Sequence, residues 1–315
     1  MTKAVEPTDL YTVLRTPDLI DPVLIVHFDG WIDAGVSAGN AVRHLIDVTG
    51  ADPLVEFDTE WLLDHRARRP TMHIIDGVNA GIDWPKIEIA AGRDSNDRDV
   101  LILSGAEPDH NWRAFTTAVV GLADRFGVSR VVALGAYPAA VPHTRSSRLT
   151  ITSPTVDLAR SNEPRATLDV PAGMAAVLEQ AFDAAGLEAL TVWAQVPHYI
   201  PPGPYPAATQ ALIEGLDETA DVSAPSGDLG EMALAARNRL DELVSDEASH
   251  KAMLSELERQ HDQYGHDGET LPTSDELAAE VEQFLRSQDD EPETDNDARE
   301  TDPEELDPEE EEDTK

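Results

Sequence analysis

The run Val23-Leu24-Ile25-Val26-His27-Phe28 decides the fold, because it is apolar on both faces apart from its histidine. Such a run is typical of a buried strand in a parallel sheet. It is followed by the Gly- and Asp-rich turn Asp29-Gly30-Trp31-Ile32-Asp33-Ala34-Gly35, and then residues 36–46 place apolar side chains at helical spacing. The stretch is therefore the first βα unit of an α/β domain. Its turn lies at the carboxyl end of the strand, where open α/β sheets place their sites.

Strands and helices continue to alternate as far as residue 216. The predicted strands are 54–57, 99–103, 130–136 and 190–196, and the longer predicted helices are 112–126 and 172–185. Two shorter runs, 72–75 and 86–89, alternate polar and apolar residues and are expected to pair as a hairpin. This order predicts a three-layer α/β/α fold with a mainly parallel sheet and helices on both faces.

The character of the chain changes after residue 220. Residues 1–220 are expected to form the α/β core, and the Ser-, Pro- and Gly-containing stretch 221–228 a linker. Residues 229–287 are expected to form a C-terminal helical appendage. Residues 288–315 are acidic and nearly free of large apolar side chains, so they are expected to be a disordered tail.

Composition excludes several classes of function. The 315 residues carry a formal charge of −39, from 62 acidic and 23 basic residues, which disfavours nucleic acid and anionic membrane as partners. The chain has no cysteine, so disulfides, thiolate metal sites and cysteine nucleophiles are excluded. No apolar run approaches the roughly 20 residues that span a bilayer, and no signal-peptide pattern is present. We therefore expect a cytoplasmic protein.

Motifs for the commonest α/β enzymes are also missing. There is no GxGxxG after a strand, no GxxxxGK[ST], no GxSxG and no HExxH, and we predict no cofactor and no metal. Asp29 and Asp33 flank the first turn, where they could act as a carboxylate pair or, alternatively, bind the turn and cap the helix. Glu107 follows the strand 99–103, where it could complete a polar rim or simply complement the dipole of the next helix.

Polar side chains follow two later strands as well. His143 and Arg145 follow the strand 130–136 and could bind an anion or carboxylate, or form structural ion pairs. His198 follows the strand 190–196 and could be a buried structural histidine. Because parallel strands end at one edge of a sheet, these side chains are expected to converge there. The candidate cleft residues are Asp29, Trp31, Asp33, Glu107, His143, Arg145 and His198.

Four of these stretches, taken in order, resemble the proteasome assembly chaperone family of the second-subunit type. They are Gly30–Gly35, Ser104–Pro108 with Trp112, Gly135–Arg145 and Val196–Tyr199. The C-terminal helices resemble those of actinobacterial members. The resemblance implies an α/β/α core like that of nucleoside phosphorylases and peptidyl hydrolases, self-association, and a chaperone or scaffold role. It supplies no catalytic set. The C-terminal hydrophobic–Tyr–any residue motif by which some archaeal relatives dock on proteasome α-rings is absent, since the chain ends Asp313-Thr314-Lys315.

Two hypotheses about function follow. The first is a non-enzymatic chaperone-like or scaffold protein that forms homo-oligomers and binds other proteins, with proteasome subunits among the candidates. The alternative is a small-molecule hydrolase, phosphorylase or ligase that uses the polar cleft at the carboxyl ends of the strands.

Overall fold

The computed structural model describes residues 5–159, 169–245 and 247–264, all of which lie in one unit, Met1–Leu271. The predicted acidic tail 288–315 and the part of the predicted appendage beyond residue 264 lie outside the described residues.

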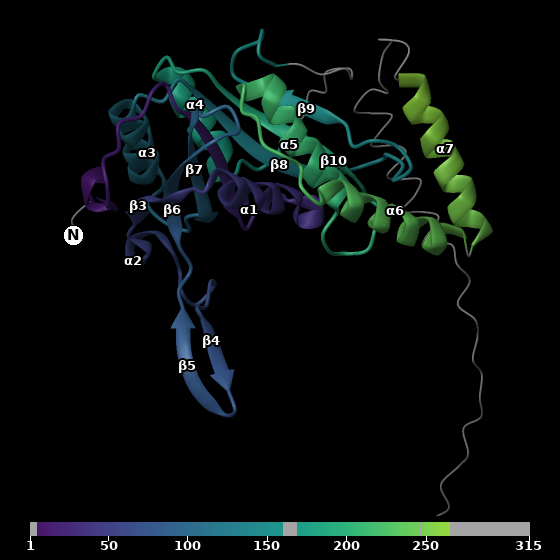
Figure 1. Cartoon of the computed structure of the whole chain (residues 1–315), viewed down its shortest axis with the longest axis horizontal. Coiled ribbons are helices and arrows are strands. Elements are labelled where there is room, and N and C mark those ends of the chain that lie inside the picture. Colours follow the sequence, from purple (N-terminus) through teal and green to yellow (C-terminus); the bar gives the residue numbers. More distant parts are fainter. Residues whose placement is uncertain (1–4, 160–168, 246, 265–315) are drawn as a thin grey trace, which may run out of the picture. The chain divides into compact units, whose positions relative to one another are not determined.

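Eight strands form one sheet in the order β1-β3-β6-β7-β2-β8-β10-β9. Their bounds are β1 Tyr11–Val13, β2 Val23–Asp29, β3 Asp52–Phe57, β6 Ile87–Arg93, β7 Asp99–Ala106, β8 Arg130–Ala139, β9 Leu149–Thr152 and β10 Ala189–Pro197. The central strands β7, β2, β8 and β10 are parallel to one another. The outer strands β6, β3, β1 and β9 are antiparallel to their neighbours. The carboxyl ends of the four central strands therefore meet at one edge (Figure 1).

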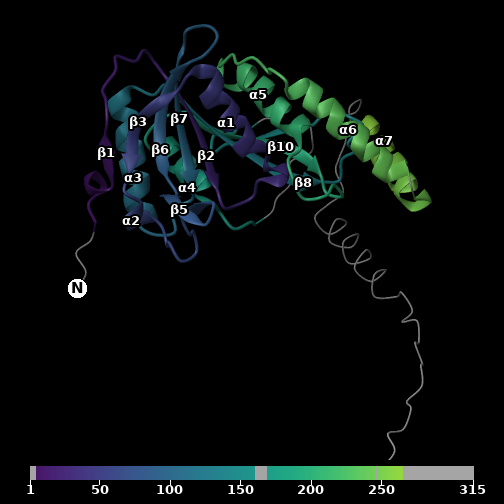
Figure 2. The same cartoon turned by 60° about the horizontal axis from the view of Figure 1, so that its bottom comes forward.

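Helices cover both faces of this sheet, which confirms the predicted three layers (Figure 2). The helical elements are η1 Pro7–Asp9, η2 Ala34–Val36, α1 Ser37–Thr49, α2 Thr59–Leu62, α3 Trp112–Phe126, α4 Met174–Ala184, α5 Pro206–Ala220, α6 Leu229–Ser245 and α7 Ala248–Tyr264. One core packs α3 and α4 against the sheet, and the other packs α1 and α5 against its opposite face.

Strand β2 supplies side chains to both cores in alternation. Leu24 and Val26 belong to the core under α3 and α4, whereas Val23 and Ile25 belong to the core under α1 and α5. Since strand side chains alternate with a period of two, His27 lies on the same face as Ile25. The histidine is therefore on the α1 side of the sheet.

The predicted hairpin between 72–75 and 86–89 is wrong. Strand β4, Thr71–Ile75, pairs with β5, Val78–Asp83, in a separate two-stranded ribbon, and β6 instead joins the main sheet between β3 and β7. The stretch 78–83 contains Asn79 and Gly81, which weaken a strand pattern, so this second strand was missed. Five large apolar side chains of the ribbon are exposed: Met72, Ile74, Ile75, Val78 and Ile82.

The C-terminal helices α6 and α7 confirm the helices expected after residue 228. The chain between α5 and α6 is anchored to the core: Val222 is fully buried, and the backbone N–H of Ser223 donates to the buried carboxylate of Asp94. Among the described helices, none combines the length and the apolar character that a bilayer span requires.

Candidate functional site

The turn between β2 and α1 is held in a strained conformation. Gly35 has φ +65°, and a Cβ at this position would come within 2.6 Å of Tyr205 Cβ, so only glycine fits without a shift. The backbone N–H of Tyr205 donates to Gly35 O over 2.9 Å. Val36 has φ +49°, an unusual conformation for a β-branched residue. Because strain of this kind persists only where the surroundings impose it, the turn is firmly fixed.

His27 is a buried site residue that was not among the predicted candidates. It is 5% exposed, and its Nδ1 lies 3.2 Å from Leu134 O. A carbonyl only accepts, so Nδ1 donates to it. Nε2 faces two carboxylates and lies 3.6 Å from Asp29 Oδ1 and 3.8 Å from Asp33 Oδ2. We call His27, Asp29 and Asp33 the acceptor cluster.

The two aspartates of this cluster have different surroundings. Asp33 accepts hydrogen bonds from the backbone N–H groups of Ala38 (2.8 Å) and Gly39 (3.0 Å), so it caps α1. The side chain of Asp29 is 71% exposed and forms no such cap. Its pKa is lowered mainly by the His27 imidazole and further by the charges of Arg43 and Arg68. Asp29 is therefore an ionised carboxylate at the open side of the cluster.

Glu107 and Trp31 meet at the start of α4, on the other face of the sheet. Glu107 Oε1 accepts from the backbone N–H of Met174 over 2.6 Å and so caps this helix. Trp31 is 46% exposed and lies so close to Gly173 that a Cβ there would come within 2.9 Å of its ring. The backbone N–H of Glu107 donates to Asp29 O, which joins this group to the turn.

Arg68 is a second residue that the sequence did not single out for the site. Its guanidinium covers Gly30, and its Nε lies 3.2 Å from Asp109 Oδ2. Asp109 in turn accepts from the backbone N–H of Asp64. No local pattern connects Arg68 with Asp109, because the two are far apart in the chain and meet only in the folded sheet.

His143 belongs to a different polar group, and both of its ring nitrogens are paired. Nδ1 lies 2.7 Å from the hydroxyl of Tyr199, and Nε2 lies 3.2 Å from Asp241 in α6. Burial lowers the pKa of His143, although Asp241 opposes this, and burial raises the pKa of Tyr199 to about 12. The neutral imidazole thus accepts from the tyrosine hydroxyl and donates to the carboxylate.

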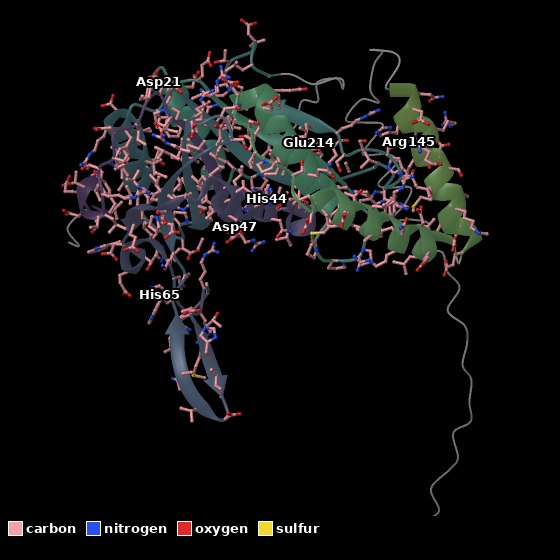
Figure 3. The ribbon with its side chains drawn as sticks, viewed as in Figure 1. Asp21, His44, Asp47, His65, Arg145 and Glu214 are labelled. Atoms are coloured by element: carbon pink, nitrogen blue, oxygen red, sulfur yellow. The ribbon has the colours of Figure 1, made fainter. Side chains whose placement is uncertain are left out.

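Arg145 extends this group to α7 (Figure 3). Its guanidinium pairs with Asp262 (2.7 Å) and Glu258 (3.2 Å), which lowers the pKa of Asp262 to about 2. We call His143, Arg145 and Tyr199, together with their partners Asp241, Glu258 and Asp262, the strap. The strap fastens α6 and α7 to the loops that follow β8 and β10.

His198 lies beside the strap. Its backbone N–H and its Nδ1 both contact Ala139 O, and its ring lies edge-on to Tyr199 with centroids 5.5 Å apart. The structure thus divides the seven predicted residues. Asp29, Trp31, Asp33 and Glu107 gather around the first turn, whereas His143, Arg145 and His198 gather under α6 and α7.

The donor set of the acceptor cluster limits its chemistry. Within the described part of the chain, no group of three His, Asp or Glu side chains is arranged to hold a metal ion. His27 lies between two carboxylates, and neither Asp29 nor Asp33 orients a second catalytic side chain.

Comparison with solved structures defines the class of protein first. A Mycobacterium tuberculosis proteasome-assembly chaperone homologue is 35% identical, with a TM-score of 0.68, over 75% of this chain and 99% of its own. A PAC2 family protein from Streptomyces avermitilis is 34% identical, with a TM-score of 0.67, over 74% of this chain and 100% of its own. A protein of unknown function from Corynebacterium glutamicum is 29% identical, with a TM-score of 0.77, over 82% and 98%. The fold is that of proteasome-assembly chaperone homologues.

The family follows from the sequence itself. A model described as the PAC2 family matches residues 27–244, which is more than half of the chain. The chain therefore belongs to the PAC2 family, as its four motifs predicted. Comparison with curated proteins found no match.

Proposed function

We propose that this PAC2 family member is a non-enzymatic, chaperone-like or scaffold protein that binds other proteins, with proteasome subunits as the first partners to test. One observation carries the proposal: 35% identity over three quarters of the chain with a protein described as a proteasome-assembly chaperone homologue. A cytoplasmic location is part of the proposal.

The site supports this function because its side chains have structural partners. Asp33 and Glu107 cap helices, and Arg145 holds α7. The exposed Trp31 offers an aromatic anchor of the kind that contributes most to protein interfaces. The exposed apolar residues of the β4–β5 ribbon offer a second contact surface, and a lone two-stranded ribbon is marginally stable without a partner. Self-association through this ribbon is part of the proposal.

The test is an assembly assay with the full chain. Purified proteasome α and β subunits from an actinobacterium are mixed with and without the protein, and particle formation is followed on native gels. We expect faster assembly and a captured intermediate. Trp31→Ala should weaken subunit binding by about tenfold, the effect of a typical aromatic anchor, whereas Ile20→Ala, at another exposed apolar position, should not. Equal assembly rates with and without the protein would overturn the proposal.

The enzyme hypothesis is supported by a single observation, the buried imidazole of His27 beside two carboxylates. A hydrolase, phosphorylase or ligase would need this imidazole as its base. Turnover of activated esters and of nucleosides with phosphate is the measurement, with His27→Gln as the variant. Activity that the variant abolishes would favour the enzyme over the chaperone.

A further inference from the structure

A pocket of about 340 Å³ lies at the edge of the sheet opposite to the acceptor cluster, where β7 begins and β6 ends. Its walls come from the chain between β1 and β2, the end of α1, the start of β3, and the adjoining ends of β6 and β7. The volume is at the small end of the range of about 300–1,000 Å³ in which proteins bind small molecules. The pocket therefore suits a small ligand.

Glycine at position 92 sets the distance between β6 and α1 beside this pocket. A Cβ on Gly92 would come within 2.7 Å of Thr49 O and 2.8 Å of Thr49 Oγ1, so any other residue would push the strand and the helix apart. Thr49 is buried, and its hydroxyl donates to Leu45 O over 2.7 Å. This part of the lining is therefore fixed by the fold.

Arg15 brings a positive charge that no carboxylate of the described residues balances. Its Nε donates to Pro53 O (3.0 Å), and its Nη2 donates to Asp52 O (2.7 Å) and Ala91 O (3.0 Å). All three acceptors are neutral carbonyls, and they hold the guanidinium across the ends of β3 and β6. The Nη1 group remains available to a ligand.

Arg93 lines the same pocket and is only partly engaged. It follows Ala91 by two residues, so the two side chains share a face of β6. Its Nε lies 3.1 Å from Asp99 Oδ1, whereas Asp99 Oδ2 accepts from the backbone N–H of Ile20 over 2.8 Å. Both oxygens of the buried Asp99 are thus committed, and the Nη groups of Arg93 have no partner within the described chain. Guanidinium groups with free N–H donors recognise carboxylates.

Negative groups line the pocket as well. Helix α1 ends at Thr49 and Gly50, and the carbonyl end of a helix favours a cation. Asp18 and Asp52 are exposed, and neither carboxylate has a partner among the described side chains and N–H groups. The lining therefore offers both charges to a ligand.

We propose that this pocket binds a small zwitterion, an α-amino acid, whose carboxylate is held by Arg15 and Arg93 and whose ammonium is held by Asp18 and Asp52. A simple anion would lie beside two unpaired carboxylates, and a simple cation would lie beside two guanidinium groups. A ligand that carries both charges gives each of these four side chains a partner of opposite sign.

Apolar side chains select the kind of amino acid. Pro17 and Leu19 line the pocket from the chain between β1 and β2, and Ala91 lines it from β6. An aliphatic side chain suits this lining, so leucine is the probe. The pocket shares no residue with Trp31 or the β4–β5 ribbon, and the site stands whether or not the chaperone role does.

The test is ¹⁵N NMR of the full chain, with the Nε–H signals of Arg15 and Arg93 as the readout. It is run at about pH 6.5, where the α-carboxyl group (pKa about 3.5) is ionised and the α-amino group (pKa about 8) is protonated. We expect leucine to shift both signals saturably. N-acetylleucine lacks the ammonium and leucinamide lacks the carboxylate. Each should bind about tenfold more weakly than leucine, as expected when a charge-assisted hydrogen bond is lost.

Variants assign the two charges of the ligand to the two kinds of side chain. Asp18→Asn, at an exposed side chain that the fold does not use, should weaken leucine binding by about tenfold and leave N-acetylleucine binding unchanged. Arg93→Lys keeps a cation beside Asp99 but loses the planar fork, and should weaken the binding of both compounds. The matched controls are Asp47→Asn, an exposed acid of α1 outside the lining (Figure 3), and Arg113→Lys, an exposed arginine of α3. Neither control should change the binding.

Three results would overturn the proposal. They are the absence of a saturable shift with leucine, equal binding of leucine and either blocked form, and unchanged leucine binding in Asp18→Asn. None of them would affect the proteasome assembly assay, which depends on other surfaces.

Discussion

The acceptor cluster and the strap each contain a buried histidine, but the two rings have different partners. In the strap both ring nitrogens of His143 are hydrogen-bonded, Nδ1 with Tyr199 and Nε2 with Asp241. In the acceptor cluster Nδ1 of His27 contacts a backbone carbonyl, whereas Nε2 lies 3.6 Å and 3.8 Å from the carboxylates of Asp29 and Asp33.

The difference indicates two different roles. A polar network in which every atom is paired rigidifies its surroundings, and in the strap it joins α6 and α7 to the core. In the acceptor cluster Asp33 caps α1, whereas the side chain of Asp29 is 71% exposed. The strap is therefore a closed structural network, and the acceptor cluster keeps one carboxylate open to solvent.

Replacing His143 should have the largest effect on stability. His143→Ala leaves a cavity and removes the ring contacts with Asp241 and the Tyr199 hydroxyl. We expect the free energy of unfolding to fall by about 2–4 kcal/mol, measured by urea denaturation. Tyr199→Phe removes only the hydroxyl and should cost about 1–2 kcal/mol. A loss below that of Tyr199→Phe would show that the strap does not hold this part of the fold.

Within the acceptor cluster, the two aspartates should differ. Asp33→Ala removes the cap from the N–H groups of Ala38 and Gly39 and should lower the free energy of unfolding by about 1–2 kcal/mol. Asp29→Ala, at an exposed side chain, should change it by no more than about 0.5 kcal/mol. Equal losses would mean that Asp29 too is structural. The measurement is again urea denaturation.

The sequence predicted the elements that local patterns specify. The helix 112–126 was predicted with its observed bounds, because its apolar spacing is regular and Gly127 ends it in the left-handed conformation. Strand β2 and its turn were likewise predicted, since an apolar run and a Gly–Asp turn are local signals. The strand 78–83 was missed, and β6 was assigned to the wrong partner, because strand pairing depends on contacts distant in sequence.

The candidate site was predicted in part for the same reason. The rule that parallel strands end at one edge grouped seven residues, but it does not say which face each side chain takes or which helices lie above it. A signal for His27 was available: it is two residues before Asp29, so the two share a face of β2. For Arg68 and for the α6 and α7 partners of His143 and Arg145, no local signal exists.

Lowering the pH should weaken the strap closer to neutrality than the pH at which carboxylates take up protons. Burial lowers the pKa of His143 below 6.5, and burial together with Arg148 lowers the pKa of His261, which lies in α7. The folded chain then binds fewer protons than the unfolded chain between the two pKa values, so stability rises with pH there. Hydrogen exchange should show the amides of α6 and α7 fully protected above pH 6.5 and less protected below it. The loss of protection should be smaller than the loss that His143→Ala causes.

The charges that face these histidines are Asp241, Arg237 and Glu258 for His143, and Arg148, Asp262 and Arg145 for His261. Glu179 in α4 gives the stability the opposite pH dependence, because burial raises the pKa of this carboxyl from 4.5 to about 7. Its contribution to the free energy of unfolding is present below pH 4.5 and is lost as the pH rises through 7. Exchange must therefore be measured at α7 and α4 separately. Unchanged protection of α7 below pH 6.5 would contradict the role of His143 in the strap.

The smallest effect is expected from Arg145, because its ion pairs are partly open to solvent. Arg145→Gln removes the contacts with Asp262 and Glu258, and should speed amide exchange in α7 by about two- to fivefold, the range of exposed pairs. Added salt should produce the same change in the unmodified chain and no further change in the variant, because it screens the same pairs. Lys251→Gln removes an equal charge from α7 and is the control. If salt still speeds exchange in Arg145→Gln, ionic contacts other than those of Arg145 hold α7 to the core.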